Sequence, residues 1–181
     1  VSSQKREAPV MVGLDFGTSF TKAYCNIAGD NAPVEFRVGE RNSYYLPSEV
    51  YFDKKRKFLS MKEWPGFERV RYFKYNMIND ELRSSYEGVQ NISFDVLCSV
   101  FFLANAIKEI KSVASRRAPG KNLKYHFNMG CPIANEDSRF KGVYDQALNV
   151  AYVLSDKFLP ETMSLEKIAS LYNANASESS A

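Results

Sequence analysis

Residues 10–25 read Val-Met-Val-Gly-Leu-Asp-Phe-Gly-Thr-Ser-Phe-Thr-Lys-Ala-Tyr-Cys, and this stretch decides the fold. The apolar segment 10–14 predicts a short strand, and the polar segment 15–19 interrupts it. Residues 21–25 then resume the strand pattern. We therefore expect a β-hairpin whose turn contains a glycine.

The segment 15–19 carries the groups that a polyphosphate needs. Gly17 has no Cβ, so it allows the backbone to approach a phosphate and to adopt a positive φ angle where one is required. Thr18 and Ser19 can donate hydrogen bonds from hydroxyl and amide groups, and Asp15 can hold Mg²⁺ through water. The same residue types also populate ordinary hairpin turns, so an ordinary turn is the alternative interpretation.

The remaining sequence alternates between strand-like and helix-like patterns. Ser93 can cap the clearest helix, in which apolar residues recur at three- and four-residue steps. The expected elements are a turn at 26–31, strands at 34–38 and 47–52, short helices and loops over 53–92, a helix over 94–114, a strand at 123–129, a helix at about 137–155 and an amphipathic segment at 163–172.

Charge and composition exclude several classes of partner. The formal net charge is only +3, from 24 basic and 21 acidic residues, which does not favour nucleic acid. The basic run 54–57 is expected to be the solvated tip of a hairpin. No apolar run is long enough to span a membrane, so we expect a cytoplasmic protein without a membrane partner.

The cysteines and the single histidine do not predict a site. Cys25, Cys98 and Cys131 lie in apolar stretches without a pairing pattern, which indicates buried reduced thiols. His126 lies in a strand-like run without the partners of a zinc site. We assign structural roles to these side chains.

The stretch 12–19 resembles the first phosphate motif of the actin-like ATPase superfamily, which includes heat-shock chaperones, actins and sugar kinases. Three later segments resemble the seventy-kilodalton heat-shock chaperones in particular. They are Leu46-Pro47-Ser48-Glu49-Val50-Tyr51-Phe52, Val70-Arg71-Tyr72-Phe73-Lys74, and Met129-Gly130-Cys131-Pro132-Ile133-Ala134-Asn135-Glu136-Asp137-Ser138-Arg139.

The resemblance implies an α/β fold: a ribonuclease H-like lobe with a mixed, five-stranded sheet flanked by helices and a smaller inserted α+β subdomain at about 40–118. The lobe would cover 10–172, between a disordered tail at 1–9 and a disordered end at 173–181. Pro132 would belong to a strand end near a hinge that senses nucleotide. Its simpler role is to end a strand before a helix.

The resemblance also implies the site residues and cofactors. ATP and Mg²⁺ would be bound in the full-length protein by Asp15, Gly17, Thr18, Ser19 and Phe20, with Asp15 holding the metal through water. Lys74 would act with Asp15 in catalysis by stabilising charge on the transferred phosphoryl group. Arg69 and Arg71 are rivals for the role of Lys74, and all three can also be ordinary surface charges.

The implied function is that of an ATP-hydrolysing chaperone, with peptide clients and co-chaperones as partners. The second phosphate loop and the adenosine motif of the superfamily do not occur in residues 1–181, so we expect this piece alone to bind ATP weakly and to be inactive. A sugar or small-acid kinase is one alternative, because residues 20–23 resemble the opening of that group. An actin-like filament or scaffold protein is the other, with the aromatic-rich stretch 64–75 as a partner surface.

Overall fold

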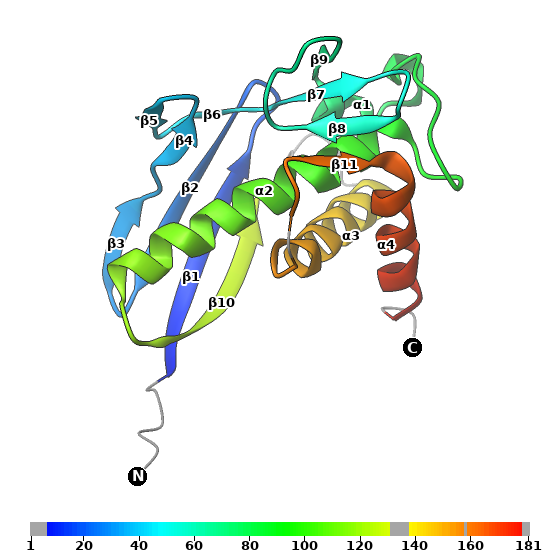
Figure 1. The fold of residues 1–181 in the computed structure, drawn as a ribbon. Helices are drawn as coiled ribbons and strands as arrows, with labels where there is room; N and C mark the ends of the chain where they lie inside the picture. The colour runs from blue at the N-terminus through cyan, green and yellow to red at the C-terminus, as the bar shows by residue number, and fades with distance from the viewer. Residues whose placement is uncertain (1–6, 131–137, 158, 179–181) are drawn as a thin grey trace.

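The computed structural model describes residues 7–130, 138–157 and 159–178, which form an α/β structure (Figure 1). Its strands are β1 (Glu7–Phe16), β2 (Phe20–Ile27), β3 (Asp30–Pro33), β4 (Phe36–Val38), β5 (Arg41–Ser43), β6 (Leu46–Pro47), β7 (Glu49–Asp53), β8 (Phe58–Ser60), β9 (Glu68–Arg71), β10 (Asn122–Met129) and β11 (Thr162–Ser164). Its helices are α1 (Phe73–Asn76), the short 3₁₀ helix η1 (Asp80–Leu82), α2 (Phe94–Arg117), α3 (Ser138–Ser155) and α4 (Leu165–Glu178).

The main sheet has the strand order β10-β1-β2-β3, and β6 adds a fifth strand by pairing with β2. β1 and β2 form the expected antiparallel hairpin, in which Leu14 lies opposite Ala23. β10 runs parallel to β1, and Leu14 lies opposite Met129 on that side. The sheet is therefore mixed and five-stranded in the described part of the chain, as the resemblance implied.

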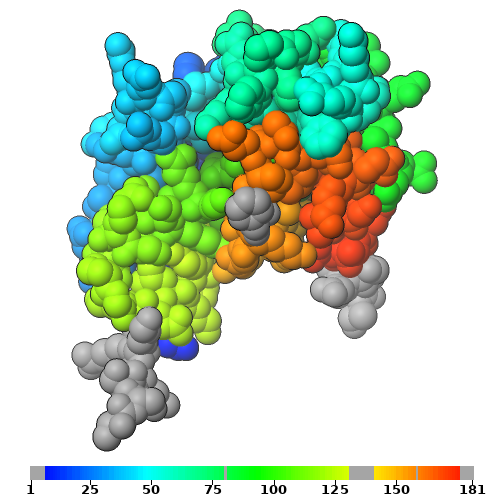
Figure 2. Space-filling view, in the orientation of Figure 1, coloured from blue at the N-terminus to red at the C-terminus, as the bar shows by residue number. Residues whose placement is uncertain are grey.

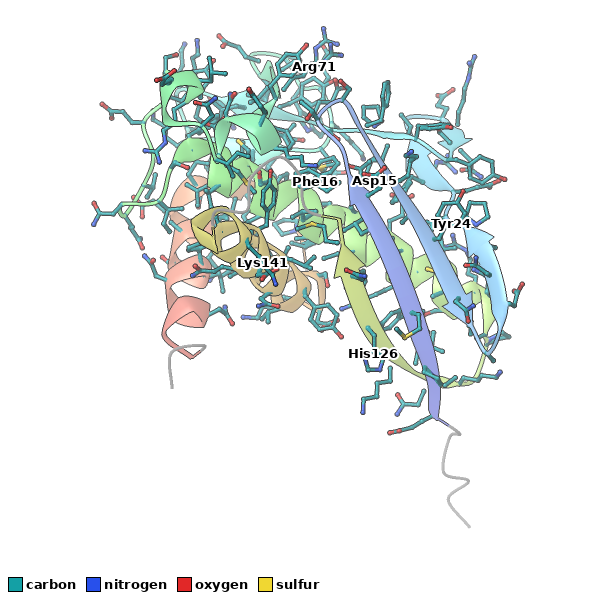
Figure 3. The ribbon with its side chains drawn as sticks, turned by 180° about the vertical axis from the view of Figure 1, so that it is seen from behind. Asp15, Phe16, Tyr24, Arg71, His126 and Lys141 are labelled. Carbon is teal, nitrogen blue, oxygen red and sulfur yellow. The ribbon has the colours of Figure 1, made fainter. Side chains whose placement is uncertain are left out.

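One face of this sheet is buried and the other is exposed. Val12, Leu14 and Phe16 alternate along β1 with exposed residues, because successive side chains of a strand point to opposite faces. The buried face packs beneath α2 (Figure 1). Figure 3 shows the opposite face, where Asp15, Tyr24 and His126 lie.

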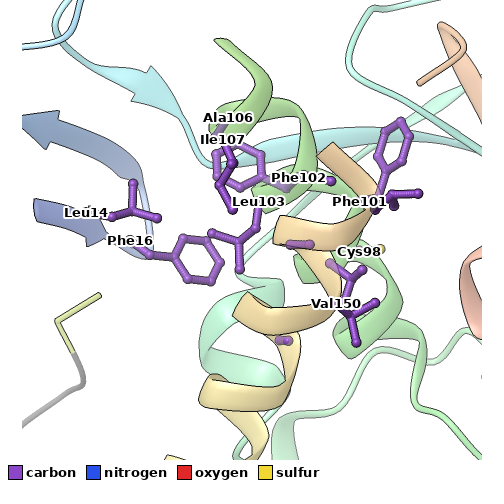
Figure 4. Packing of buried hydrophobic residues seen from close by; sticks show 14 of the residues in the cluster. Leu14, Phe16, Cys98, Phe101, Phe102, Leu103, Ala106, Ile107 and Val150 are labelled. Carbon is purple, nitrogen blue, oxygen red and sulfur yellow. The ribbon is translucent and has the colours of Figure 1, made fainter. Parts of the chain in front are cut away.

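α2 connects the two halves of the described core. The Ser93 side chain accepts a hydrogen bond from the amide of Val96, so it caps the helix as expected. Phe102 on the buried side of α2 stacks against Phe16, with ring centroids 5.7 Å apart. Figure 4 shows Leu14 and Phe16 meeting the apolar side chains of α2. The helix thus seals the end of β1 that leads into the glycine turn.

A second sheet, with strand order β11-β8-β7-β9, lies beside the main one. β7 and β8 form a hairpin, and the exposed basic run 54–57 is its turn, which confirms that prediction. β6 and β7 are separated by Ser48 alone. The chain therefore passes from the main sheet to the second sheet at this residue.

Several boundaries differ from the expected ones. The strand expected at 34–38 forms only over 36–38, as β4, because β3 already ends at Pro33 and residues 34 and 35 belong to no strand. β4 pairs with β5 outside the main sheet. β8 and β9 replace part of the expected loop region 53–92. β1 already begins at Glu7, inside the tail expected at 1–9, and α4 continues to Glu178, inside the end expected from 173.

α2 lies across the main sheet (Figure 1). The inserted subdomain expected at about 40–118 stays a prediction. No helix in the described ranges is both long and apolar enough to cross a membrane. Cys131 and Pro132 lie outside the described residues.

Candidate functional site

The turn between β1 and β2 requires a glycine at position 17. A Cβ built on Gly17 would lie 2.1 Å from the carbonyl oxygen of Phe20, far inside van der Waals contact. The backbone at Gly17 is not in the left-handed region, unlike that at Gly29. Close approach of the backbone, and not a positive φ angle, is therefore the reason for this glycine.

Ser48 ties the turn to the link between the two sheets. Its Oγ donates to the carbonyl oxygen of Gly17 at 2.8 Å and lies 2.9 Å from Oγ1 of Thr21. Its amide donates to the carbonyl oxygen of Ser19 at 3.0 Å. Ser48 and Thr21 are both buried, so this network is protected from water and holds the turn in one shape.

Replacing Ser48 with alanine is expected to lower the free energy of unfolding by about 1–3 kcal/mol. The change leaves the buried Thr21 hydroxyl and the Gly17 carbonyl without this partner, and unpaired buried polar groups are costly. Urea denaturation followed by circular dichroism measures the difference. Ser112→Ala is the control, because Ser112 is exposed on α2 and alanine is favourable in a helix. Equal stabilities of the two variants would contradict the structural role of Ser48.

Lys74 reaches the same turn from α1. Its Nζ donates to the carbonyl oxygen of Phe16 and lies 5.3 Å from the centre of the Phe16 ring. The hydroxyl of Tyr144 on α3 donates to the carbonyl oxygen of Lys74 at 3.3 Å. The structure therefore brings the ammonium group of Lys74 to the residue that precedes Gly17.

A cavity of about 260 Å³ opens beside the turn. Its lining includes Thr18, Ser19, Phe20, Arg71 and Tyr72. The other predicted site residues, Asp15, Gly17 and Lys74, are not among the residues that line it. Nε of Arg71 lies 2.9 Å from a carboxylate oxygen of Glu49, so its charge is partly balanced. Arg69 is exposed on β9 and opposite Tyr51, and it is not among the residues that line this cavity.

Sequence reasoning missed Tyr72 as a site residue. Its backbone has φ 63°, the left-handed conformation, immediately before α1. This conformation costs about 1–2 kcal/mol per residue for side chains other than glycine. It turns the chain between Arg71, which lines the cavity, and Lys74, whose amine donates to the carbonyl oxygen of Phe16. No pattern in the sequence predicts this backbone angle.

Asp15 lies next to the turn but does not line this cavity. It lies on the exposed face of the main sheet (Figure 3), where its Oδ2 is 3.3 Å from Nζ of Lys22. Both side chains are about half exposed, so the ion pair contributes about 0–1 kcal/mol and can open when a cation arrives. In the described residues no cluster of three or more His, Cys, Asp or Glu side chains is suited to hold a metal ion. Asp15 would therefore contribute a single carboxylate.

The cysteines of the described chain are unsuited to nucleophilic chemistry. Burial raises the pKa of the Cys25 thiol to about 11, although the nearby Arg117 opposes this effect. Burial also raises the pKa of the Cys98 thiol well above its ordinary value. Thiolates are the reactive form, so both residues act as apolar core groups, as expected from the sequence.

Comparisons with known proteins add no assignment to this geometry. No family model matches the chain. A search of curated proteins likewise gives no match. The turn, its Ser48 support and the approach of Lys74 are therefore the observations on which a function can be built.

A larger hollow of about 560 Å³ lies next to α2, between Arg37, Tyr51 and Glu109. None of the predicted site residues lines it. Burial is the main reason that the pKa of Glu109 is raised. We do not place the proposed site there, because it lacks the backbone turn and the lysine that meet at residues 16–19.

Proposed function

We propose that this chain is the N-terminal lobe of an ATP-binding protein with a ribonuclease H-like fold, and that the whole protein is an ATP-hydrolysing chaperone of the seventy-kilodalton heat-shock type. The observation that carries the proposal is the approach of the Lys74 ammonium to the carbonyl of Phe16, at the entrance of the glycine turn. Lys74 and residues 15–19 were both chosen through the resemblance, and Phe16 and Lys74 are 58 positions apart in the chain.

The position of β6 supports the same proposal. The Leu46-Pro47-Ser48 segment belongs to the second part of the resemblance, and its Ser48 hydroxyl binds Gly17 in the first part. β6 itself pairs with the start of β2. Three separate segments of the resemblance therefore converge on one turn, which is the arrangement that a phosphate site needs.

The groups at the turn suit a polyphosphate. The amides of residues 17–19 and the hydroxyls of Thr18 and Ser19 are the donors, and the ammonium of Lys74 supplies positive charge. Bound Mg²⁺ would neutralise phosphate charge, and Asp15 would hold it through water once the contact with Lys22 opens. The role of this chain is then to position and stabilise the phosphates, without a covalent intermediate.

Mg-ATP is expected to bind the 181-residue chain only weakly, with a dissociation constant of about 1 mM. One turn and one lysine contact only one side of the phosphates, so most of the ligand remains in water. Titration monitored by amide NMR spectra should shift the signals of residues 15–20 and 72–74. Inorganic tripolyphosphate with Mg²⁺ should shift the same signals, whereas adenosine should not.

The Lys74→Ala variant is expected to bind Mg-ATP about tenfold more weakly in this NMR titration, because one charge-assisted contact is lost. Lys62→Ala is the matched control, since Lys62 pairs with Glu161, whereas Lys74 donates to the carbonyl oxygen of Phe16 in the turn. Two results would contradict the proposal. One is that the signals of residues 15–20 do not shift at a ligand concentration of about 10 mM. The other is that the Lys74 variant binds with unchanged affinity.

A further inference from the structure

Arg71 is the basic residue whose side chain lines the cavity beside the glycine turn. The same cavity of about 260 Å³ is lined by Thr18 and Ser19, the two hydroxyl residues of the proposed phosphate site. Neither Arg69 nor Lys74 is among its lining residues. In the described part of the chain, the positive charge on the wall of this cavity therefore comes from Arg71.

Strand pairing carries Arg71 to this position. Arg71 ends β9 and lies opposite Glu49 of β7, the residue that follows Ser48. Because Ser48 donates to the carbonyl oxygens of Gly17 and Ser19, one short stretch of chain fixes both the turn and the strand that Arg71 pairs with. Figure 3 shows Arg71 close to the turn between β1 and β2.

The guanidinium of Arg71 is oriented, and only part of it is engaged. Its Nε lies 2.9 Å from Oε2 of Glu49, whose other carboxylate oxygen accepts from the hydroxyl of Tyr51 at 3.3 Å. Within the described residues, no hydrogen bond is assigned to the two terminal nitrogens of Arg71. An arginine side chain has five N–H donors in one plane, and this side chain is 48% exposed. Its terminal nitrogens can therefore donate to a ligand.

We propose that Arg71 binds one phosphate group of the polyphosphate in this cavity, together with the hydroxyls of Thr18 and Ser19. This inference rests on the proposed function, and it adds a second cation to the site at a place that Lys74 does not line. Arginine suits the role because two of its N–H groups can donate in parallel to two oxygens of a phosphate. The contact with Glu49 orients the guanidinium through Nε, so this ion pair stays intact when the phosphate binds.

Directed hydrogen bonds, and not net charge, attract the phosphate to this cavity. Arg71 and Glu49 are the charged side chains of its described wall, and their charges balance. Both belong to the second sheet, which lies at the surface of the molecule (Figure 2, cyan to green). Water and salt screen other exposed charges there. Removing the guanidinium of Arg71 should therefore weaken binding far more than removing an equal charge nearby.

The first test measures affinity for inorganic tripolyphosphate with Mg²⁺, titrated at constant ionic strength and followed by the amide NMR signals of residues 18–20. Arg71→Gln is expected to bind this probe about tenfold more weakly, because a charge-assisted contact with two hydrogen bonds is lost. Arg69→Gln is the matched control, since Arg69 is exposed on the same strand and does not line the cavity. Its affinity should change by less than about twofold.

The second test needs no substitution. The Nε–H group of Arg71, which Glu49 holds in place, gives its own signal in a ¹⁵N spectrum and can be assigned through bonds from the backbone amide. This signal should shift as tripolyphosphate binds, whereas that of Arg69 should not. The measurement keeps the inference testable if circular dichroism shows that Arg71→Gln does not fold.

The outcomes separate this inference from the nucleotide proposal. If the signals of residues 18–20 shift but Arg71→Gln binds with unchanged affinity, the inference fails and the proposed function stands. Equal losses for Arg71→Gln and Arg69→Gln would indicate attraction by charge alone, and they too would overturn the inference. An unchanged Nε–H signal of Arg71 at about 10 mM tripolyphosphate would have the same meaning. If no signal of residues 15–20 shifts, both proposals fail.

Discussion

The Phe73→Ala variant is expected to lose about 3–5 kcal/mol of the free energy of unfolding, the usual cost of truncating a buried phenylalanine. Phe73 is fully buried, and its ring lies 5.6 Å from that of Phe102 and 6.3 Å from that of Phe16. The three rings join α1, α2 and the end of β1. Urea denaturation followed by circular dichroism measures the loss.

The same substitution should also weaken the nucleotide-dependent NMR shifts. α1 has only four residues, one of which is Lys74. The buried ring of Phe73 anchors this short helix to the core and so fixes the position of Lys74. Tyr75→Ala is the control on the same helix, because Tyr75 is 48% exposed, and its effect should be within about 0.5 kcal/mol. A similar small loss for Phe73→Ala would show that the three rings do not form a stabilising core.

Alanine at Gly17 is expected to destabilise the chain by about 1–3 kcal/mol and to abolish the shifts caused by Mg-ATP. Its methyl group would occupy the space of the Phe20 carbonyl, so the turn must change shape, and crowding of this kind carries that cost. The Ser48 hydroxyl would then lose the geometry in which it meets the Gly17 carbonyl. Thermal unfolding and NMR titration measure the two effects.

Gly13→Ala provides a matched comparison on β1, the strand that leads into the turn. A Cβ at Gly13 would have no heavy atom within 4 Å, and alanine restricts the unfolded chain more than glycine does. Stability should therefore be unchanged or slightly higher, and ligand shifts should be retained. If both variants behaved alike, the close approach at Gly17 would not be what forms the site.

Local patterns predicted the elements whose stabilising contacts are local. The hairpin of β1 and β2 follows from two apolar segments around a polar, glycine-containing turn. α2 follows from its apolar repeat and from the cap at Ser93. β10 was predicted as a strand, but its parallel pairing with β1 depends on the whole length of α2 between them. Such a pairing cannot be derived from the strand alone.

The second sheet could not be predicted because its strands are short and its pairings are distant. β8 has three residues and β9 has four, too few for an alternating pattern to be recognised. β8 pairs with β11, about one hundred positions further along the chain. At 34–38 the alternation was real, since Val34 and Phe36 are buried. The two residues nevertheless bond to different strands: the amide of Val34 donates to Ala23 of β2, and Phe36 of β4 pairs with Ser43 of β5.

The residues of the proposed site were chosen from the sequence, and they stay a prediction, but the contacts that support the turn could not be predicted. Gly17, Thr18 and Ser19 were chosen from their residue types, and Lys74 was chosen from the resemblance to the heat-shock chaperones. Whether Asp15 faces a ligand depends on which face of the sheet it occupies. The alternation along β1 places Asp15 on the exposed face and Phe16 on the buried face. The bridging role of Ser48 arises only when β6 lies against β2. That contact is tertiary, and no local rule contains it.

Ser48 also gives the molecule a mechanical linkage. It alone separates β6 of the main sheet from β7 of the second sheet. Its hydroxyl and amide also donate to the carbonyl oxygens of Gly17 and Ser19. A displacement of the start of β7 would therefore reach the glycine turn directly, through the backbone and hydrogen bonds of one serine.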